Sequence, residues 1–269
     1  MTKGSKRVRP PDDRDTTIPE IVDRATWQAE LDALRVREKA HTREGDAIAA
    51  ARRRLPMVEV DPTATLIGDN GPVTLLDAFE GREQLIAYYH MWHTGHSAEE
   101  QCEGCTFFNG QVRELSNLHS RDVTYATLCQ GPYDASVRYR DFMAWDVPWY
   151  SAQDAADALL GDRPRSPAPL VCYLRREDQV FETYWTSGRG LEAMDNSYGL
   201  LDLTAYGRRE AWEDTPDSWP RPLWRAGANP FRTGPRPIAQ WDRITGGRSD
   251  DLGSTGHAPA GRTGAERDD

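Results

Sequence analysis

The 269-residue chain is poor in cysteine and in long apolar runs, and its 33 basic residues are outnumbered by 43 acidic ones. Its four cysteines are too few for a disulfide framework, so we expect a reducing, cytoplasmic environment. No apolar run approaches the ~20 residues of a membrane-spanning helix, and the polar N-terminus lacks the apolar stretch of a secretory signal. The formal charge of −10 is opposite in sign to that of a general nucleic-acid binder. We therefore expect neither a membrane nor a nucleic acid as partner.

Aromatic residues compensate for a hydrophobic content of only 38%, because nine Trp, ten Tyr and six Phe can build a core. Changes in polarity predict a flexible tail over 1–20, a helical arm over 21–56, a domain with a C-terminal extension over 57–245, and a disordered tail over 246–269. The arm has apolar residues at helical spacing, which predicts one long or two consecutive helices. Such an amphipathic arm packs on its own sheet or forms a homodimer.

Strand and helix patterns alternate through the domain. The predicted elements are strand 57–60, turn 68–71, helix 75–79, strand 85–92, helix 102–120, strand 123–128, helix 134–145, strand 148–151 and the hairpin strands 170–174 and 180–184. Asp134 is the expected N-cap of its helix. Helices that connect parallel strands, followed by a hairpin, predict an α/β, thioredoxin-like fold with a mixed sheet flanked by helices.

Cys102 and Cys105 stand where the strand 85–92 gives way to the next helix. Cysteines three residues apart on the first turn of a helix share one face and can form a disulfide. Unpaired amides and the helix dipole favour a thiolate at Cys102. We therefore predict a thiol–disulfide oxidoreductase in which Cys102 is the nucleophile and Cys105 resolves the mixed disulfide. The carboxylate of Glu103 should raise the pKa of Cys102 and make the dithiol a reductant.

The predicted partners are a protein or small molecule that carries a thiol or a disulfide, and an external reductant, because the sequence contains no dinucleotide-binding motif. No cofactor is required. A low-pKa, exposed thiolate is also oxidised by peroxide, so a thiol peroxidase is an alternative. A non-catalytic scaffold, acting through its arm and tails, is another.

Three histidines near the dithiol support a metal-binding alternative. On a strand, residues three apart point to opposite faces, so His90 and His93 should not converge. His93 and His96 fall in a loop and could join Cys102 and Cys105 around zinc or copper. The other interpretation is a polar loop in which His93 or His96 transfers protons to or from the thiols.

Three further residues lie near the predicted sheet. Pro169 immediately precedes the hairpin, where a thioredoxin-like fold places a cis proline that faces the dithiol and positions the substrate. Cys129 ends the strand 123–128, and Cys172 lies in the hairpin. Both are expected in the core as small apolar residues, with a role as third redox partner as the alternative for Cys129.

The same residues carry a resemblance to a known family. The matching segments are Arg52–Val60, Leu85–Trp92, Cys102–Cys105, Arg121–Thr124, Pro148-Trp149, Val180–Tyr184, Arg189–Leu191 and Leu201–Thr204. Over about residues 20 to 220 the chain resembles the thioredoxin-like proteins catalogued as domain of unknown function 899, which are labelled predicted dithiol-disulfide oxidoreductases. The resemblance implies a thioredoxin-like fold and the redox pair Cys102 and Cys105. It also draws attention to Arg189, which either binds a substrate anion near the dithiol or forms a structural ion pair.

Overall fold

The computed structural model describes residues 18–161, 163, 168–220 and 222. The predicted N-terminal tail lies outside the described residues up to residue 17, and the predicted C-terminal tail lies wholly outside them. The chain divides near residues 47 and 196 into two compact units. One contains residues 48–196 and with them the dithiol; the other contains most of the first helix and the segment that begins at Ser197.

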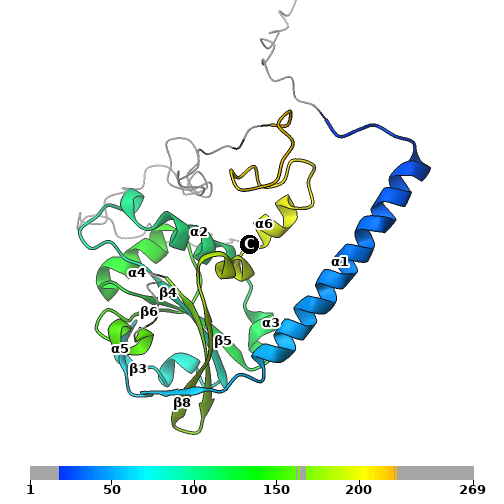
Figure 1. Ribbon diagram of the computed structural model, residues 1–269. Coiled ribbons are helices and arrows are strands. Elements are labelled where there is room, and N and C mark those ends of the chain that lie inside the picture. Colours follow the sequence, from blue (N-terminus) through cyan, green and yellow to red (C-terminus); the bar gives the residue numbers. More distant parts are fainter. Residues whose placement is uncertain (1–17, 162, 164–167, 221, 223–269) are drawn as a thin grey trace, which may run out of the picture. The chain divides into compact units, whose positions relative to one another are not determined.

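The predicted elements occur in the predicted order, and the structure adds elements that were not predicted, among them strands over 65–68 and 71–74 and a short helix over 156–160 (Figure 1). The helices are α1 (Arg24–Arg52), η1 (Asp77–Phe79), η2 (Ala98–Glu100), α2 (Glu103–Gln111), α3 (Ser116–His119), α4 (Tyr133–Phe142), α5 (Ala156–Leu160), η3 (Gly188–Met194) and α6 (Asn196–Leu201), where η marks a 3-10 helix. The strands are β1 (Val58–Val60), β2 (Thr65–Gly68), β3 (Gly71–Thr74), β4 (Gln84–His90), β5 (Val123–Cys129), β6 (Trp149–Ser151), β7 (Leu170–Arg176) and β8 (Gln179–Thr186).

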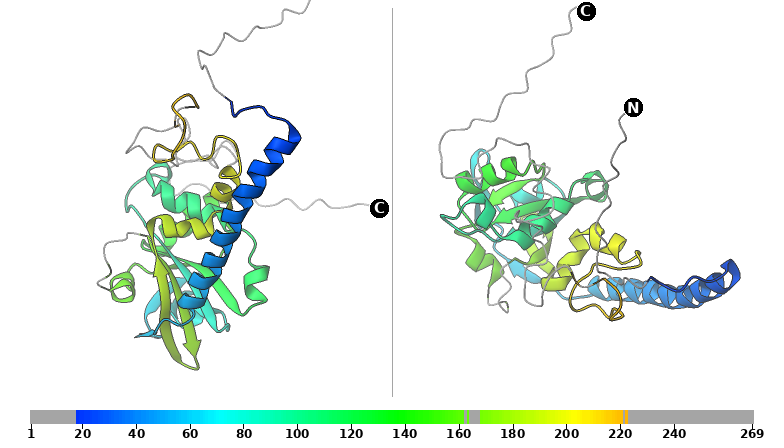
Figure 2. Two further views of the ribbon diagram at one scale, coloured as in Figure 1. Left: turned by 45° about the vertical axis from the view of Figure 1, so that its right-hand side comes forward. Right: turned by 90° about the horizontal axis from the view of Figure 1, so that it is seen from above.

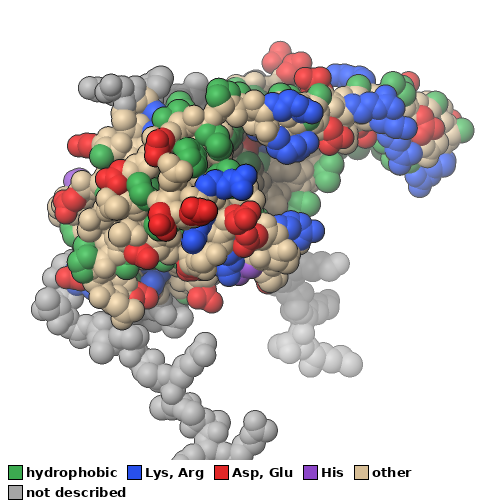
Figure 3. Space-filling view, turned by 90° about the horizontal axis from the view of Figure 1, so that it is seen from below, with side chains coloured by type: hydrophobic (Ala, Val, Ile, Leu, Met, Phe, Trp, Pro, Cys, Tyr) green, Lys and Arg blue, Asp and Glu red, His purple; other side chains and the backbone are tan. Residues whose placement is uncertain are grey.

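The predicted arm is one helix, α1, which runs without a break through Gly45 (Figures 1 and 2). It begins after Asp23, whose carboxylate accepts the N–H groups of Ala25 and Thr26 at 2.8 and 3.0 Å and so caps the first turn. None of its residues is buried. Basic and acidic side chains alternate along it, with apolar side chains between them (Figure 3).

The sheet has the strand order β1-β8-β7-β4-β5-β6-β2-β3. β4 and β5 are parallel, as are β5 and β6, and β7 runs antiparallel to β4 and to β8. A parallel β4–α2–β5 crossover beside the antiparallel β7–β8 hairpin is the thioredoxin-like arrangement, so the predicted fold class is confirmed. The β2–β3 hairpin extends the other edge through one pairing, of Ile67 with Ser151.

The period-two pattern of the strands divides the core between the two faces of the sheet. Tyr88 and Tyr125 pack on one face with Cys105 and Phe108 of α2. Their neighbours in sequence, such as Tyr89 and Ala126, pack on the other face against η1 and α5. The face that carries α2 is therefore the face that carries the dithiol.

The helix boundaries differ from the prediction: η1 begins at Asp77 instead of residue 75, and α4 ends at Phe142 instead of residue 145. The helix that starts at the dithiol ends at Gln111, because Val112 is extended at φ −83° and ψ 108°, and a separate turn, α3, follows. Val112 still packs on the core, which is why the helical spacing of apolar residues continued past the end of the helix. The N-cap of α4 is Pro132, and Asp134 stands inside the first turn, where a carboxylate interacts favourably with the helix dipole.

Candidate active site

Cys102 is the N-cap of α2, as predicted. Its φ and ψ of −56° and 109° are not helical, and its Sγ accepts the N–H of Cys105 at 3.4 Å. The Thr106 hydroxyl donates to the Cys102 carbonyl at 2.8 Å and fixes the first turn. A sulfur in this position lies at the unpaired amides and the positive end of the helix dipole.

The two cysteines of the pair differ in exposure and in acidity. Cys102 is partly exposed, Cys105 is 2% exposed, and both thiols are free. The hydrogen bond from the Cys105 thiol, helped by the N–H groups of Cys105 and Gly104 and by the charge of His93, lowers the pKa of Cys102 to about 7, although burial opposes this shift. Burial raises the pKa of Cys105 well above its ordinary value. Near neutral pH the pair therefore combines a thiolate at Cys102 with a thiol at Cys105 that donates to it.

The pKa of Cys102 is lowered, so the rise expected from Glu103 is wrong. The hydrogen bonds that Cys105 directs at the sulfur stabilise the thiolate and prevail. Glu103 itself occupies the first helical position of α2, where a carboxylate interacts favourably with the helix dipole. The reducing character of the dithiol stays a prediction.

Gln101 organises the loop between β4 and α2. Its buried side chain accepts the His93 N–H at 3.0 Å and donates to the carbonyls of His93 and His96 at 2.9 and 3.3 Å. Nδ1 of His93 lies 2.9 Å from the Glu100 carbonyl, and Nδ1 of the exposed His96 lies 3.7 Å from the Glu100 carboxylate. His93 helps to lower the pKa of Cys102. Proton transfer by either histidine stays a prediction.

The zinc or copper alternative lacks a preformed set of ligands. Within the described ranges, no group of three or more His, Cys, Asp or Glu residues is arranged to hold a metal ion. Zinc sites generally use four ligands, whereas Nδ1 of His93 contacts the Glu100 carbonyl. Bringing His93 and His96 to Cys102 and Cys105 would require the loop to rearrange.

Sequence reasoning missed an aromatic cage in the core that holds the dithiol. His90, the last residue of β4, is fully buried, and its ring centroid lies 5.4 to 6.3 Å from those of Tyr88, Tyr139, Trp145 and Trp149. Burial lowers the pKa of His90 to about 4, so the imidazole is neutral near pH 7. The period-two pattern of β4 was the available signal, because it places Tyr88 and His90 on the face that carries the dithiol.

Buried hydrogen bonds fix α2 on the sheet. The side-chain oxygen of Asn109 accepts the hydroxyls of Tyr125 at 3.0 Å and Thr127 at 2.6 Å. The Thr106 and Tyr139 hydroxyls lie 2.8 Å apart and join α2 to α4. The helix that carries the dithiol is thus held by polar groups as well as by apolar packing.

The peptide bond before Pro169 is trans, so the predicted cis proline is wrong. The trans isomer is the lower-energy form of an X–Pro bond, and the Pro169 carbonyl accepts the Tyr89 N–H at 3.0 Å, which extends the pairing of β7 with β4. Ala168 and Leu170, on either side of Pro169, are buried in the same cluster as Cys105. A substrate-positioning role for Pro169 stays a prediction.

Arg189 lies in η3, which packs against α2. Its Nε is 2.8 Å from Oε1 of Glu192, so Arg189 forms an ion pair within its own turn. The Arg189 side chain is also 67% exposed. Binding of a substrate anion by this guanidinium stays a prediction.

The other two cysteines lie in the sheet. Cys129 is fully buried, and burial raises its pKa to about 12. Cys172 is partly exposed, and burial raises its pKa as well. Both thiols are protonated near neutral pH. Cys129 is a core residue, as expected, whereas Cys172 lies outside both core clusters.

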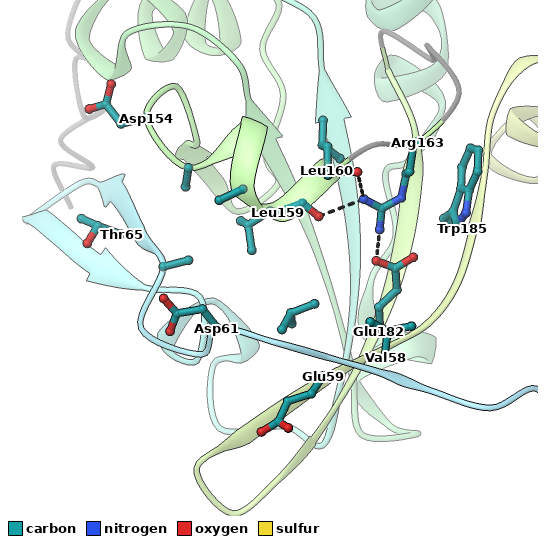
Figure 4. A pocket seen from close by; sticks show the side chains of 15 residues that line it. Val58, Glu59, Asp61, Thr65, Asp154, Leu159, Leu160, Arg163, Glu182 and Trp185 are labelled. Carbon is teal, nitrogen blue, oxygen red and sulfur yellow. Dashed lines mark hydrogen bonds and ion pairs between the residues drawn. The ribbon is translucent and has the colours of Figure 1, made fainter.

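A pocket of about 690 Å³ lies away from the dithiol (Figure 4). It is bounded by β1, the start of β2, α5 and β8, and neither Cys102 nor Cys105 lines it. Arg163 donates to the Leu159 carbonyl at 2.9 Å and pairs with Glu182 on its wall (Figure 4). The charge of Arg163 is therefore balanced within the protein.

A protein-family model matches residues 16–225, described as a bacterial protein of unknown function, DUF899. The chain belongs to the DUF899 family. Among solved structures, this DUF899 protein is similar to apo Sco1 from Thermus thermophilus, with 16% sequence identity over 52% of this chain and 88% of that chain and a TM-score of 0.32. No curated protein sequence matches the chain significantly. In the part that the structure describes, no helix is long and apolar enough to cross a membrane.

Proposed function

We propose that this DUF899 protein is a cytoplasmic thiol–disulfide oxidoreductase that uses Cys102 and Cys105. The observation that carries the proposal is the asymmetry of the pair. Cys102 is partly exposed at a helix N-terminus with a pKa of about 7, and Cys105 is a buried thiol that donates to it. A nucleophile whose pKa is near the ambient pH is the most effective attacking thiol, and a neighbouring thiol is what resolves its mixed disulfide.

In the reducing direction, the Cys102 thiolate attacks one sulfur of a substrate disulfide. The Cys102–substrate bond forms, and the second substrate sulfur leaves as a thiolate, which takes up a proton from water. Cys105 loses its proton to water and attacks Sγ of Cys102, so the Cys102–Cys105 disulfide forms and the first substrate sulfur leaves. An external dithiol then returns two electrons to the protein. His93 is the candidate for proton transfer at Cys102, because it is near enough to influence the pKa of this thiol.

The substrate we propose is a protein or small-molecule disulfide that approaches the exposed side of Cys102. Pro169 and Arg189 are the candidates for its positioning. Leu170, which follows Pro169, and Leu191, two residues after Arg189, belong to the core cluster that contains Cys105, so both candidates are tied to the site through the core.

Disulfide reduction by the full chain tests this function. With glutathione disulfide or a reporter peptide disulfide as substrate and dithiothreitol as reductant, we expect the wild type to accelerate reduction above the uncatalysed rate and Cys102→Ser to give no acceleration. In the absence of dithiothreitol, reduced Cys105→Ser should release one equivalent of substrate thiol and then stop, because it has no second thiol to resolve the mixed disulfide. Cys172→Ser is the matched control, since it removes a thiol of the same sheet outside the pair, and it should turn over as the wild type does. Equal rates for Cys102→Ser and the wild type would contradict the proposal.

A thiol peroxidase is the second candidate, because a partly exposed thiolate of pKa about 7 also reacts with peroxide. The Cys102 thiolate would attack the peroxide O–O bond, form a sulfenic acid and release water or an alcohol, and Cys105 would then form the disulfide with loss of water. Rapid consumption of hydrogen peroxide, without reduction of either disulfide substrate, would favour this candidate over the first.

A further inference from the structure

Met91, the residue that follows β4, connects Cys105 to the buried cage. Its N–H donates to Sγ of Cys105 at 3.4 Å, and its carbonyl lies 2.7 Å from Nδ1 of His90. A carbonyl only accepts hydrogen bonds, so Nδ1 carries the proton and donates. The backbone of Met91 is thus held from two sides, by the sulfur at its N–H and by the imidazole at its carbonyl.

His90 is itself held firmly. It is fully buried at the end of β4, and four aromatic rings surround its imidazole. The backbone of His90 is also paired, because its carbonyl accepts the N–H of Gln130 at 2.9 Å. A side chain confined in this way can fix the conformation of the next residue, whose carbonyl it binds.

A donor at Cys105 matters when the active-site disulfide opens. The attacking external thiolate bonds to Sγ of Cys102, the Cys102–Cys105 bond breaks, and the electron pair goes to Sγ of Cys105. This sulfur is buried, and an unpaired buried charge is costly. A backbone N–H that already points at the sulfur stabilises the charge without rearrangement.

We propose that His90 is a positioning residue for Cys105: its Nδ1–H holds Met91 so that the Met91 N–H points at the Cys105 sulfur and stabilises the thiolate that leaves there. The proposal rests on the proposed redox function. His90 does not contact the substrate and acts through the backbone of Met91.

Two substitutions at one position separate the hydrogen bond from the packing. His90→Phe keeps an aromatic ring in the cage and removes the donor, whereas His90→Asn places an amide N–H near the position of Nδ1. Trp145→Phe is the matched control, because it trims a ring of the same cage and its indole N–H has no hydrogen-bond partner in the described part of the chain.

Stopped-flow opening of the oxidised protein by dithiothreitol gives the rate at which Cys105 leaves. We expect opening to be about tenfold slower in His90→Phe, as the loss of one hydrogen bond to a charged group implies. His90→Asn should recover most of the rate, and Trp145→Phe should open as the wild type does. Equal rates in His90→Phe and the wild type would overturn the proposal, as would equal slowing in all three variants, which would indicate packing alone.

Hydrogen exchange at the Met91 amide of the reduced protein gives a readout that needs no turnover. We expect His90→Phe to exchange this amide at least tenfold faster than the wild type and His90→Asn to protect it. Unchanged protection in His90→Phe would overturn the positioning role even if the protein is an oxidoreductase. If His90→Phe loses the protection but the wild type reduces no disulfide, the positioning of Met91 stands and the redox function fails.

Discussion

Removal of the Cys105 thiol should raise the pKa of Cys102. The hydrogen bond from that thiol is the largest contribution that lowers this pKa to about 7, and the Cys105 N–H adds a smaller one. Against an ordinary cysteine pKa of about 8.5, the shift of roughly 1.5 units corresponds to about 2 kcal/mol in favour of the thiolate. At pH 7 about half of Cys102 is then ionised, whereas an ordinary cysteine is about 3% ionised.

Cys105→Ala removes the thiol donor and keeps the N–H at the same position. We expect the pKa of Cys102 to rise to about 8, which lowers the ionised fraction at pH 7 to roughly a tenth and slows alkylation about fivefold. The assay is the rate of alkylation by iodoacetamide between pH 5 and 10, measured on the Cys102 peptide by mass spectrometry. The plateau rate at high pH should not change, because the intrinsic reactivity of the thiolate is nearly the same.

Cys172→Ala is the control for this measurement and should leave the profile of Cys102 unchanged. The reasoning would be refuted if the wild-type midpoint lay near 8.5, since the helix N-terminus and its donors would then have no effect. It would also be refuted if the midpoints of the wild type and Cys105→Ala coincided.

Three further predictions follow from the buried core and the glycines. The pKa of His90 is about 4 in the folded protein, against ~6.5 for an ordinary histidine. The neutral, buried imidazole therefore contributes stability that is present above about pH 6.5 and is lost as the pH falls to about 4. Urea unfolding should show about 3 kcal/mol of acid destabilisation in this window that is absent in His90→Phe. Gly131→Ala should destabilise the protein by about 1–3 kcal/mol in urea unfolding, because a Cβ there would overlap the Trp92 ring; an unchanged midpoint would contradict this packing. Gly45→Ala, with nothing within 4 Å of the new methyl group, should instead increase the thermal stability of α1 by about 1 kcal/mol, and a loss of helix ellipticity would contradict it.

Local patterns predicted the elements that position the dithiol. The apolar run at Leu85–Trp92 and the polar turn between residues 174 and 180 correspond to β4 and the β7–β8 hairpin, because burial and turn chemistry act over a few residues. The spacing of Cys102 and Cys105 placed the first of them correctly at the helix N-terminus.

Features that depend on distant residues could not be predicted in this way. The donors that set the pKa of Cys102 depend on three-dimensional geometry, so the sequence suggested the wrong direction from Glu103 alone. The His90 cage draws Trp145 and Trp149 from a segment more than fifty residues away, as the numbering in the sequence shows. The peptide bond before Pro169 is trans, and the Pro169 carbonyl accepts the N–H of Tyr89 in a distant strand. The local sequence of prolines does not reveal this pairing.

Trapping of a mixed disulfide tests the central claim most directly. When reduced Cys105→Ser is mixed with a disulfide-containing protein extract, Cys102 should form a stable covalent adduct that dithiothreitol releases, and mass spectrometry of the released partner would identify the substrate. Cys105→Ser/Cys172→Ser should trap the same adduct, which excludes the other partly exposed thiol. An adduct that forms only with Cys102→Ser would show that the roles of the two cysteines are reversed, and the absence of an adduct from every variant would contradict thiol–disulfide exchange as the function of this site.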